Sequence, residues 1–198
     1  MTDASSSALI LIEYVNDRLS PTGGIYPVLQ DREQVDTAVA NSKIILKEAR
    51  RRGMHVIHAP LKFEPTFKVL GEGKYGLRKM VRDYGSFLGE QADFFPGFEP
   101  AAGEHVVRER AGGSSVFIGT TLDGYLRNNR VEDIYLSGFS LRQCVESSMR
   151  NAHDLGYDTN VIYDASAGYT RKQQDDFMAE ITPFYANAIT TQEFLVQA

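Results

Sequence analysis

The sequence alternates short, almost continuously apolar segments with longer segments whose apolar residues recur at helical spacing. The first apolar segment, ALILIEYV at residues 8–15, is rich in β-branched residues and predicts a strand that is buried on both faces. Residues 33–52 follow with apolar residues at helical spacing and stop at Gly53, which predicts a helix. This order of elements is typical of a parallel sheet whose strands are joined by right-handed helical crossovers.

The same alternation continues to the end of the sequence, except for residues 61–103. Further strands are expected at 54–60, 104–110, 132–140, 158–166 and 187–190, and further helices at 117–129, 142–155, 172–185 and in TTQEFLVQ, where Thr191 is the expected cap. The prediction is therefore one domain over residues 1–198, a three-layer Rossmann-like α/β fold with a six-stranded parallel sheet and helices on both faces.

Residues 61–103 form a long irregular stretch that is rich in Gly, Phe, Pro and charged residues, with one candidate helix in GLRKMVRDYGSFL. A loop of this length in a compact domain is usually functional. We expect it to build a lid over the site or a contact between subunits.

Composition excludes several classes of function. The 198 residues carry a formal net charge of −5, which gives no general attraction to nucleic acid or to an anionic membrane. A single cysteine cannot form an internal disulfide, and the first apolar stretch is too short for a membrane span and contains Glu13. The N-terminus has no basic leader, so a cytoplasmic protein is expected. We expect no cofactor and no metal, because the four histidines lack metal-ligand spacing and no dinucleotide or phosphate-loop motif occurs.

Three polar residues lie at predicted strand ends. In parallel sheets ligands bind outside the carboxyl ends of the strands, where Glu13, Arg110 and Cys144 are expected to meet. A helix N-terminus and a nearby Arg lower the pKa of a thiol, and an adjacent carboxylate can accept its proton. Each residue also has a structural explanation, because a lone Cys often acts as a small hydrophobe, Glu13 could cap a helix and Arg110 could be a surface charge.

With these residues in view, the chain resembles the isochorismatase-like cysteine hydrolases from Ala8 to about Leu195. The opening ALILIEYVNDRL is similar to the family's first strand, in which an acidic residue precedes an Asn-Asp pair. The segment SGFSLRQCVESSMRNAHDLGYDTNVIYDAS is similar to the family's most specific block, and TTQEFL resembles its closing helix. The resemblance implies a catalytic Asp–Lys–Cys trio, with Glu13 at the Asp position, Cys144 as the nucleophile and Arg110, or in second place Arg108, at the Lys position.

The resemblance also implies a non-proline cis peptide between Phe139 and Ser140. The backbone N–H groups of Ser140 and Cys144 would then form an oxyanion hole. Phe117 and Tyr14 are expected to contact the substrate, and because the family commonly forms dimers or larger assemblies, a homo-oligomer is expected.

The function implied is hydrolysis of a C–N bond in a small amide, ureide or related substrate through a thioester. The aspartate–histidine metal cluster of the nicotinamidase branch is missing after HVIHAPLKFEP, which argues against a metal-dependent nicotinamidase. Four positions depart from the family pattern: Glu13 and Arg110 replace Asp and Lys, Val15 replaces a Gln, and Leu141 replaces a Thr three residues before the cysteine. Two alternatives remain open: a non-catalytic small-molecule-binding protein that kept the fold, and a redox-active thiol protein.

Overall fold

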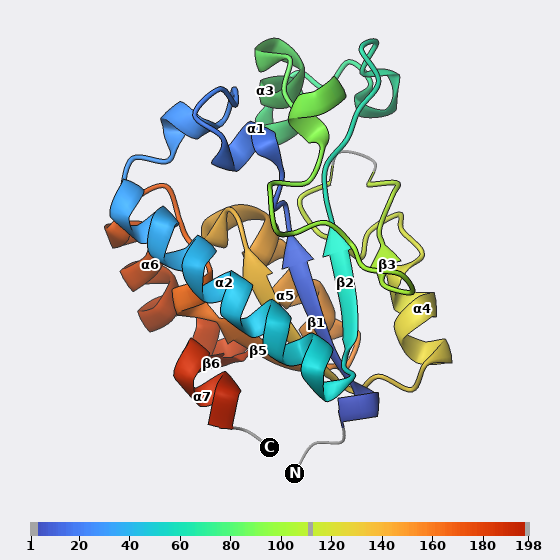
Figure 1. Cartoon of the computed structure of the whole chain (residues 1–198). Coiled ribbons are helices and arrows are strands. Elements are labelled where there is room, and N and C mark those ends of the chain that lie inside the picture. The colour runs from blue at the N-terminus through green and yellow to red at the C-terminus, as the bar shows by residue number, and fades with distance from the viewer. Residues whose placement is uncertain (1–3, 111–112, 197–198) are drawn as a thin grey trace.

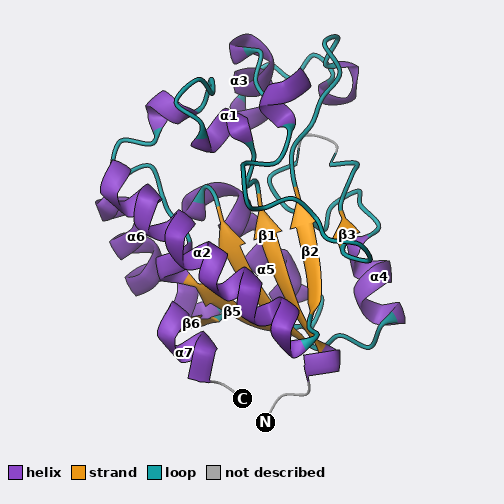
Figure 2. Ribbon diagram, in the orientation of Figure 1, coloured by secondary structure: helices purple, strands orange, loops and turns teal. Residues whose placement is uncertain are grey.

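The computed structural model describes residues 4–110 and 113–196, and its centre is a six-stranded sheet (Figure 1, Figure 2). All neighbouring strands are parallel, in the order β3-β2-β1-β4-β5-β6. The sequence prediction of a six-stranded parallel sheet is confirmed. The strands are β1 (Ser7–Ile12), β2 (His55–Ala59), β3 (His105–Val106), β4 (Asp133–Gly138), β5 (Asp158–Ile162) and β6 (Asn187–Ile189).

Strand β1 lies at the centre of the sheet, and all six of its residues are buried. It pairs on one side with β2 and on the other with β4, so that Ile12 lies opposite both Ala59 and Gly138. The carboxyl ends of these three strands therefore meet at one point. Residues that follow them in the chain are brought together although they are far apart in sequence.

Helices cover both faces of the sheet, as predicted (Figure 2). Alternate residues of β1 face opposite ways: Leu9 and Leu11 pack in the core with α2 (Arg32–Arg52) and α7 (Thr191–Val196), whereas Ile10 and Ile12 pack with α4 (Leu122–Asn128) and α5 (Glu146–Asp154). The structure also describes α1 (Asn16–Leu19), α3 (Gly76–Tyr84) and α6 (Arg171–Asp176). In the part of the chain that the structure describes, no helix has both the length and the apolar character that a membrane span requires.

Local departures from the predicted elements occur mainly at their ends. The strand expected at 104–110 is only His105–Val106, so Arg110 lies in the loop beyond it. The helix expected at 142–155 begins with a π-turn, Leu141–Val145, before α5. The closing helix is capped by Thr190 rather than by Thr191, because the Glu193 N–H donates to the Thr190 hydroxyl at 3.1 Å.

Residues 61–103 build a third apolar cluster beyond the carboxyl edge of the sheet (Figure 1). The candidate helix in this stretch is confirmed as α3. The cluster joins Val15, which follows β1, to apolar residues of the long segment, namely Leu61, Phe63, Phe67, Leu70, Val81, Phe87 and Ala92. The segment thus covers the edge at which β1, β2 and β4 end.

Gly138 allows β4 to approach β1 closely at this edge. Its φ is +136°, and a Cβ added there would lie 2.1 Å from the Ile12 carbonyl oxygen. We expect Gly138→Ala to lower the free energy of unfolding by about 3 kcal/mol or more, since it combines steric overlap with backbone strain. The matched control is Gly156→Ala, where φ is +82° but no atom lies within 4 Å, and where we expect a loss of about 1–2 kcal/mol. Urea denaturation of both variants measures the difference, and equal losses would contradict this account.

Candidate active site

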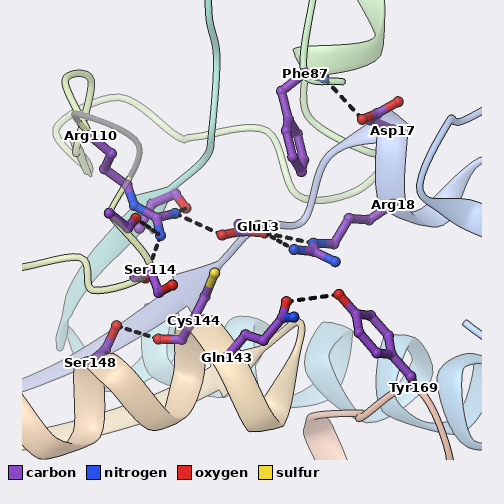
Figure 3. A network of polar contacts seen from close by, with 12 residues as sticks. Glu13, Asp17, Arg18, Phe87, Arg110, Ser114, Gln143, Cys144, Ser148 and Tyr169 are labelled. Carbon is purple, nitrogen blue, oxygen red and sulfur yellow. Dashed lines mark hydrogen bonds and ion pairs between the residues drawn. The ribbon is translucent and has the colours of Figure 1, made fainter. Parts of the chain in front are cut away.

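Glu13 follows β1 directly and is completely buried. Its φ is +61°, a left-handed conformation that a non-glycine residue adopts only where the surrounding structure enforces it. The Glu13 N–H donates to the Ala59 carbonyl at 3.1 Å, which continues the β1–β2 ladder by one residue. The side chain leaves the sheet edge and lies between residues of three other segments (Figure 3).

Two arginines hold the Glu13 carboxylate. Arg18 in α1 contacts Oε2 through Nε at 2.6 Å and Nη2 at 2.5 Å, and Arg110 contacts Oε1 through Nη1 at 3.1 Å. Both arginines are buried. Burial by itself would raise the pKa of Glu13, but the positive charges of Arg18 and then Arg110 outweigh it and lower that pKa below its usual value. The carboxylate is therefore ionised at neutral pH.

Arg110 also fixes the backbone around it. Its Nη1 donates to the Ala59 carbonyl at 3.1 Å, and its Nη2 donates to the Ser114 carbonyl at 2.6 Å. It thereby ties the end of β2 to the loop that follows β3. Of the two arginines considered for the family's Lys position, Arg110 lies beside Glu13, whereas Arg108 is exposed.

Arg18 was not predicted from the sequence as a site residue. It lies on a four-residue helix whose apolar pattern is too short to indicate a face, and arginine side chains are mostly exposed in proteins. Its guanidinium lies over the Phe87 ring, 5.6 Å from the centroid. The only sequence signal is the carboxylate itself, because a buried Glu requires a cationic partner and Arg18 is only five residues away.

Cys144 lies in the π-turn between β4 and α5, and its side chain is completely buried beside Glu13. The sulfur points toward the Glu13 carboxylate in Figure 3. Burial, together with the negative charge of Glu13, raises the pKa of the thiol to about 12, although Arg110 and Arg18 oppose the shift. The resting pair is therefore a neutral thiol next to an ionised carboxylate, which is the arrangement of a proton donor and its base.

The backbone just before the cysteine has an unusual course. The peptide between Phe139 and Ser140 is cis, the Phe139 N–H donates to Ile12 and the Leu141 N–H donates to Ala167. Ser140 is completely buried, and its hydroxyl has no hydrogen-bond partner among the described residues.

The two residues expected to contact the substrate lie in different places. Phe117 is buried in the same apolar cluster as Cys144, and the neighbouring Val116 N–H donates to the Ser148 hydroxyl, which in turn donates to the Cys144 carbonyl. Tyr14 instead belongs to the cluster on the α2 face. Its hydroxyl shares a buried network with Ser42 at 2.6 Å and Ser137 at 2.5 Å, so the structure does not bring it to the Glu13 carboxylate.

The cover over the site is attached through Asp17. Its buried carboxylate accepts the Gly24 N–H at 2.8 Å and the Phe87 N–H at 3.0 Å, which ties α1 to the 61–103 segment. Figure 3 shows the Phe87 ring pointing from that segment toward the Glu13–Arg18 pair. A cavity of about 790 Å³ reaches Arg110 and is lined by the 61–103 segment and by the chain that follows β3; the other lining residues are Lys62, Phe63, Glu64, Thr66, Lys68, Val69, Arg108, Glu109 and Gly119.

Within residues 4–110 and 113–196, no group of three or more His, Cys, Asp or Glu side chains is arranged to hold an ion.

Comparison with known proteins identifies the family. The family model described as the isochorismatase domain matches residues 7–193. The chain belongs to the isochorismatase family. It is similar to the maleamate amidohydrolase of Pseudomonas putida, with 25% identity over 96% of this chain and 85% of that protein. It is also similar to the ureidoacrylate amidohydrolase RutB of Yersinia enterocolitica, with 27% identity over 82% of this chain and 75% of that protein.

Solved structures confirm the architecture. The crystal structure of a cysteine hydrolase from Pseudomonas syringae pv. phaseolicola superposes with a TM-score of 0.83 at 19% identity, covering 98% of this chain and 92% of that one. The isochorismatase-like α/β fold predicted from the sequence is thus confirmed, and the family includes hydrolases named for C–N bond cleavage.

The two ion pairs of Glu13 predict that removal of its charge strongly destabilises the protein. Glu13→Gln leaves two buried guanidinium groups without their carboxylate, so we expect the free energy of unfolding to fall by about 3–5 kcal/mol. Glu48→Gln is the matched control, because Glu48 also pairs with two arginines, Arg51 and Arg52, but at the surface, where the expected loss is about 1 kcal/mol or less. Urea denaturation at pH 7 measures both values, and a Glu13→Gln loss as small as that of the control would contradict the pairing described.

Proposed function

We propose that this chain is a cysteine-dependent hydrolase of C–N bonds in small amides, ureides or related substrates. The observation that carries the proposal is the buried Cys144 thiol, whose sulfur points toward the buried, ionised Glu13 carboxylate. Nucleophile and base from separate segments at the carboxyl edge of a parallel sheet form the usual arrangement for covalent catalysis. The similarity to two amidohydrolases supports the same reaction class.

The first step is attack on the substrate carbonyl. Glu13 accepts the Cys144 proton, and the sulfur forms a bond with the carbonyl carbon, whose oxygen becomes an oxyanion. The backbone N–H groups of Ser140 and Cys144 stabilise that oxyanion, and each donor in such a hole contributes about 3–4 kcal/mol. Arg18 and Arg110 remain protonated throughout and hold the Glu13 carboxylate in place.

The second step releases the amine. Glu13 returns its proton to the leaving nitrogen as the C–N bond breaks, which leaves a thioester on Cys144. Glu13 then removes a proton from water, and the hydroxide adds to the thioester carbon. Collapse of that intermediate breaks the C–S bond, releases the carboxylic acid and returns the proton to the thiol.

The 61–103 segment is the proposed cover of this site. Phe117 forms an apolar wall, and Phe87 excludes water from the thiol when the segment is closed. Exposed large side chains in the same segment, Val69, Tyr75 and Tyr84, make it the expected contact in a cytoplasmic homo-oligomer.

A second candidate is a non-catalytic binding protein. It is favoured by the complete burial of Cys144 and by a thiol pKa raised to about 12, since such a thiol does not ionise on its own. The hydrolase differs from it in one respect: Glu13 must be able to take the proton when a carbonyl is present.

Removal of the nucleophile tests the covalent step. Cys144→Ala is expected to lower kcat by about 10³-fold or more with any amide or ureide that the wild type hydrolyses, because the thioester cannot form. Ammonia release measures kcat, and thermal unfolding confirms that the variant is folded. Arg150→Gln, on the surface of α5, the helix that follows Cys144, serves as the control with wild-type activity. Turnover at the wild-type rate in Cys144→Ala would exclude the proposed mechanism, and no turnover by the wild type would favour the binding protein.

The pH profile tests the resting protonation states. The active form needs an ionised Glu13 and a neutral thiol; the pKa of Glu13 is lowered and that of Cys144 is raised to about 12. We therefore expect kcat/KM to stay constant between about pH 5.5 and 9 and to fall only as the pH approaches the lowered pKa of Glu13, below its usual value of about 4.3. Initial rates with a substrate that does not titrate in this range provide the measurement. A change in kcat/KM between pH 6 and 8 would mean that the titration of another group governs the reaction.

A further inference from the structure

We propose that Arg18 binds a carboxylate of the substrate, so that the enzyme selects small amides or ureides that carry a carboxylate. This inference rests on the proposed function and specifies its substrate class. Arg18 would then have two roles: one edge of its guanidinium holds Glu13, and its remaining nitrogen recognises the substrate.

The hydrogen bonds of Arg18 leave one nitrogen available. Nε and Nη2 are both engaged by Glu13, whereas Nη1 has no hydrogen-bond partner among the residues that the structure describes. The side chain is only 2% exposed, so water does not readily reach Nη1 to serve as an acceptor. A buried charged donor without an acceptor is costly, and a ligand oxygen would satisfy it. At Arg110 both terminal nitrogens have acceptors and only Nε lacks one.

Nη1 of Arg18 lies in the same part of the site as the Cys144 thiol. Figure 3 shows the Arg18 guanidinium above the Gln143 amide and the Tyr169 hydroxyl, with the Cys144 sulfur on the other side of the Gln143 side chain. Tyr169 donates to Gln143 Oε1 at 2.7 Å, which fixes the amide and leaves its NH₂ as a further donor. A small molecule whose carboxylate bonds Arg18 would therefore hold its carbonyl close to the sulfur.

The charges of the site favour an anion. Arg18 and Arg110 carry two positive charges against the single negative charge of Glu13, and the resting thiol is neutral. Asp17 is the other buried carboxylate nearby, but it points away from the guanidinium in Figure 3 and accepts two backbone N–H groups. A substrate carboxylate would neutralise the excess positive charge, whereas a neutral amide would leave it uncompensated.

The experiment compares substrates that differ only in this charge. The pairs are maleamate with maleamide, and N-carbamoylglycine with N-carbamoylglycinamide. We expect kcat/KM for the better carboxylate-bearing compound to exceed that of its neutral partner by about 10- to 100-fold, which is the range for a hydrogen bond to a charged group. A ratio near 1 in the wild type would overturn the inference while leaving the proposed hydrolysis intact.

Variants of Arg18 test whether it is the residue responsible. Arg18→Lys keeps the positive charge beside Glu13 but has no second guanidinium nitrogen to donate to the substrate. Arg18→Gln removes both the charge and that donor. In each we expect the ratio to fall to about 3 or less, mainly through a higher KM for the carboxylate-bearing compound. Arg150→Gln is the matched control and should keep the wild-type ratio. A purely structural role of Arg18 would lower both rates together and leave the ratio unchanged, and that result would also overturn the inference.

Binding without turnover separates this inference from the proposed function. Calorimetry on Cys144→Ala should show maleamate or N-carbamoylglycine binding at least about 10-fold more tightly than its neutral partner, and Arg18→Lys in that background should abolish the preference. If the wild type hydrolyses none of the compounds but this preference is found, the proposed function fails and the carboxylate site stands. Equal binding of both members of each pair would overturn the carboxylate site.

Discussion

The Glu13 carboxylate, buried between two guanidinium groups, is the interaction on which the site depends. It joins the end of the central strand β1 to α1 through Arg18 and to the loop after β3 through Arg110, and it faces the thiol that follows β4. Removing an ionised group from water is expensive, and paired partners repay that cost only when their geometry is good. The arrangement is therefore better explained by chemistry than by stability, because apolar side chains would fill the same space at lower cost.

The sheet provides the geometry that this pairing needs. Parallel pairing of β2, β1 and β4 brings Ala59, Ile12 and Gly138 side by side, so the next residues of each strand leave from one edge. The left-handed turn at Glu13 and the π-turn around Cys144 then direct their side chains toward each other. Asp17 and Phe87 close the edge from above, which keeps water away and strengthens every charge interaction inside.

The sequence predicts the sheet and the meeting of Glu13, Arg110 and Cys144 at its carboxyl edge because these features depend on strong local patterns. Continuous apolar strands, periodic helices and polar residues at strand ends are all visible without coordinates. Arg18 escaped prediction since α1 has only four residues and thus no periodicity. Tyr14 was expected to contact substrate, but it packs in the α2 core, where its hydroxyl hydrogen-bonds with Ser42 and Ser137. The choice between Arg108 and Arg110 could not be made from alternation, because the strand ends at Val106 before either residue.

In the proposed assignment, Glu13 and Arg110 stand at the family's Asp and Lys positions, and this pair restricts how protons can move. A Lys beside the thiol could gain or lose a proton, but an Arg stays charged at every accessible pH. Glu13 is then the only member of the Glu13–Arg18–Arg110 cluster that can take up the thiol proton. Both of its oxygens already bond guanidinium groups, which lowers its basicity and opposes the transfer of the thiol proton. A ligand that draws Arg18 toward itself would weaken one of these bonds, so binding at Arg18 and proton acceptance at Glu13 are coupled through a single guanidinium.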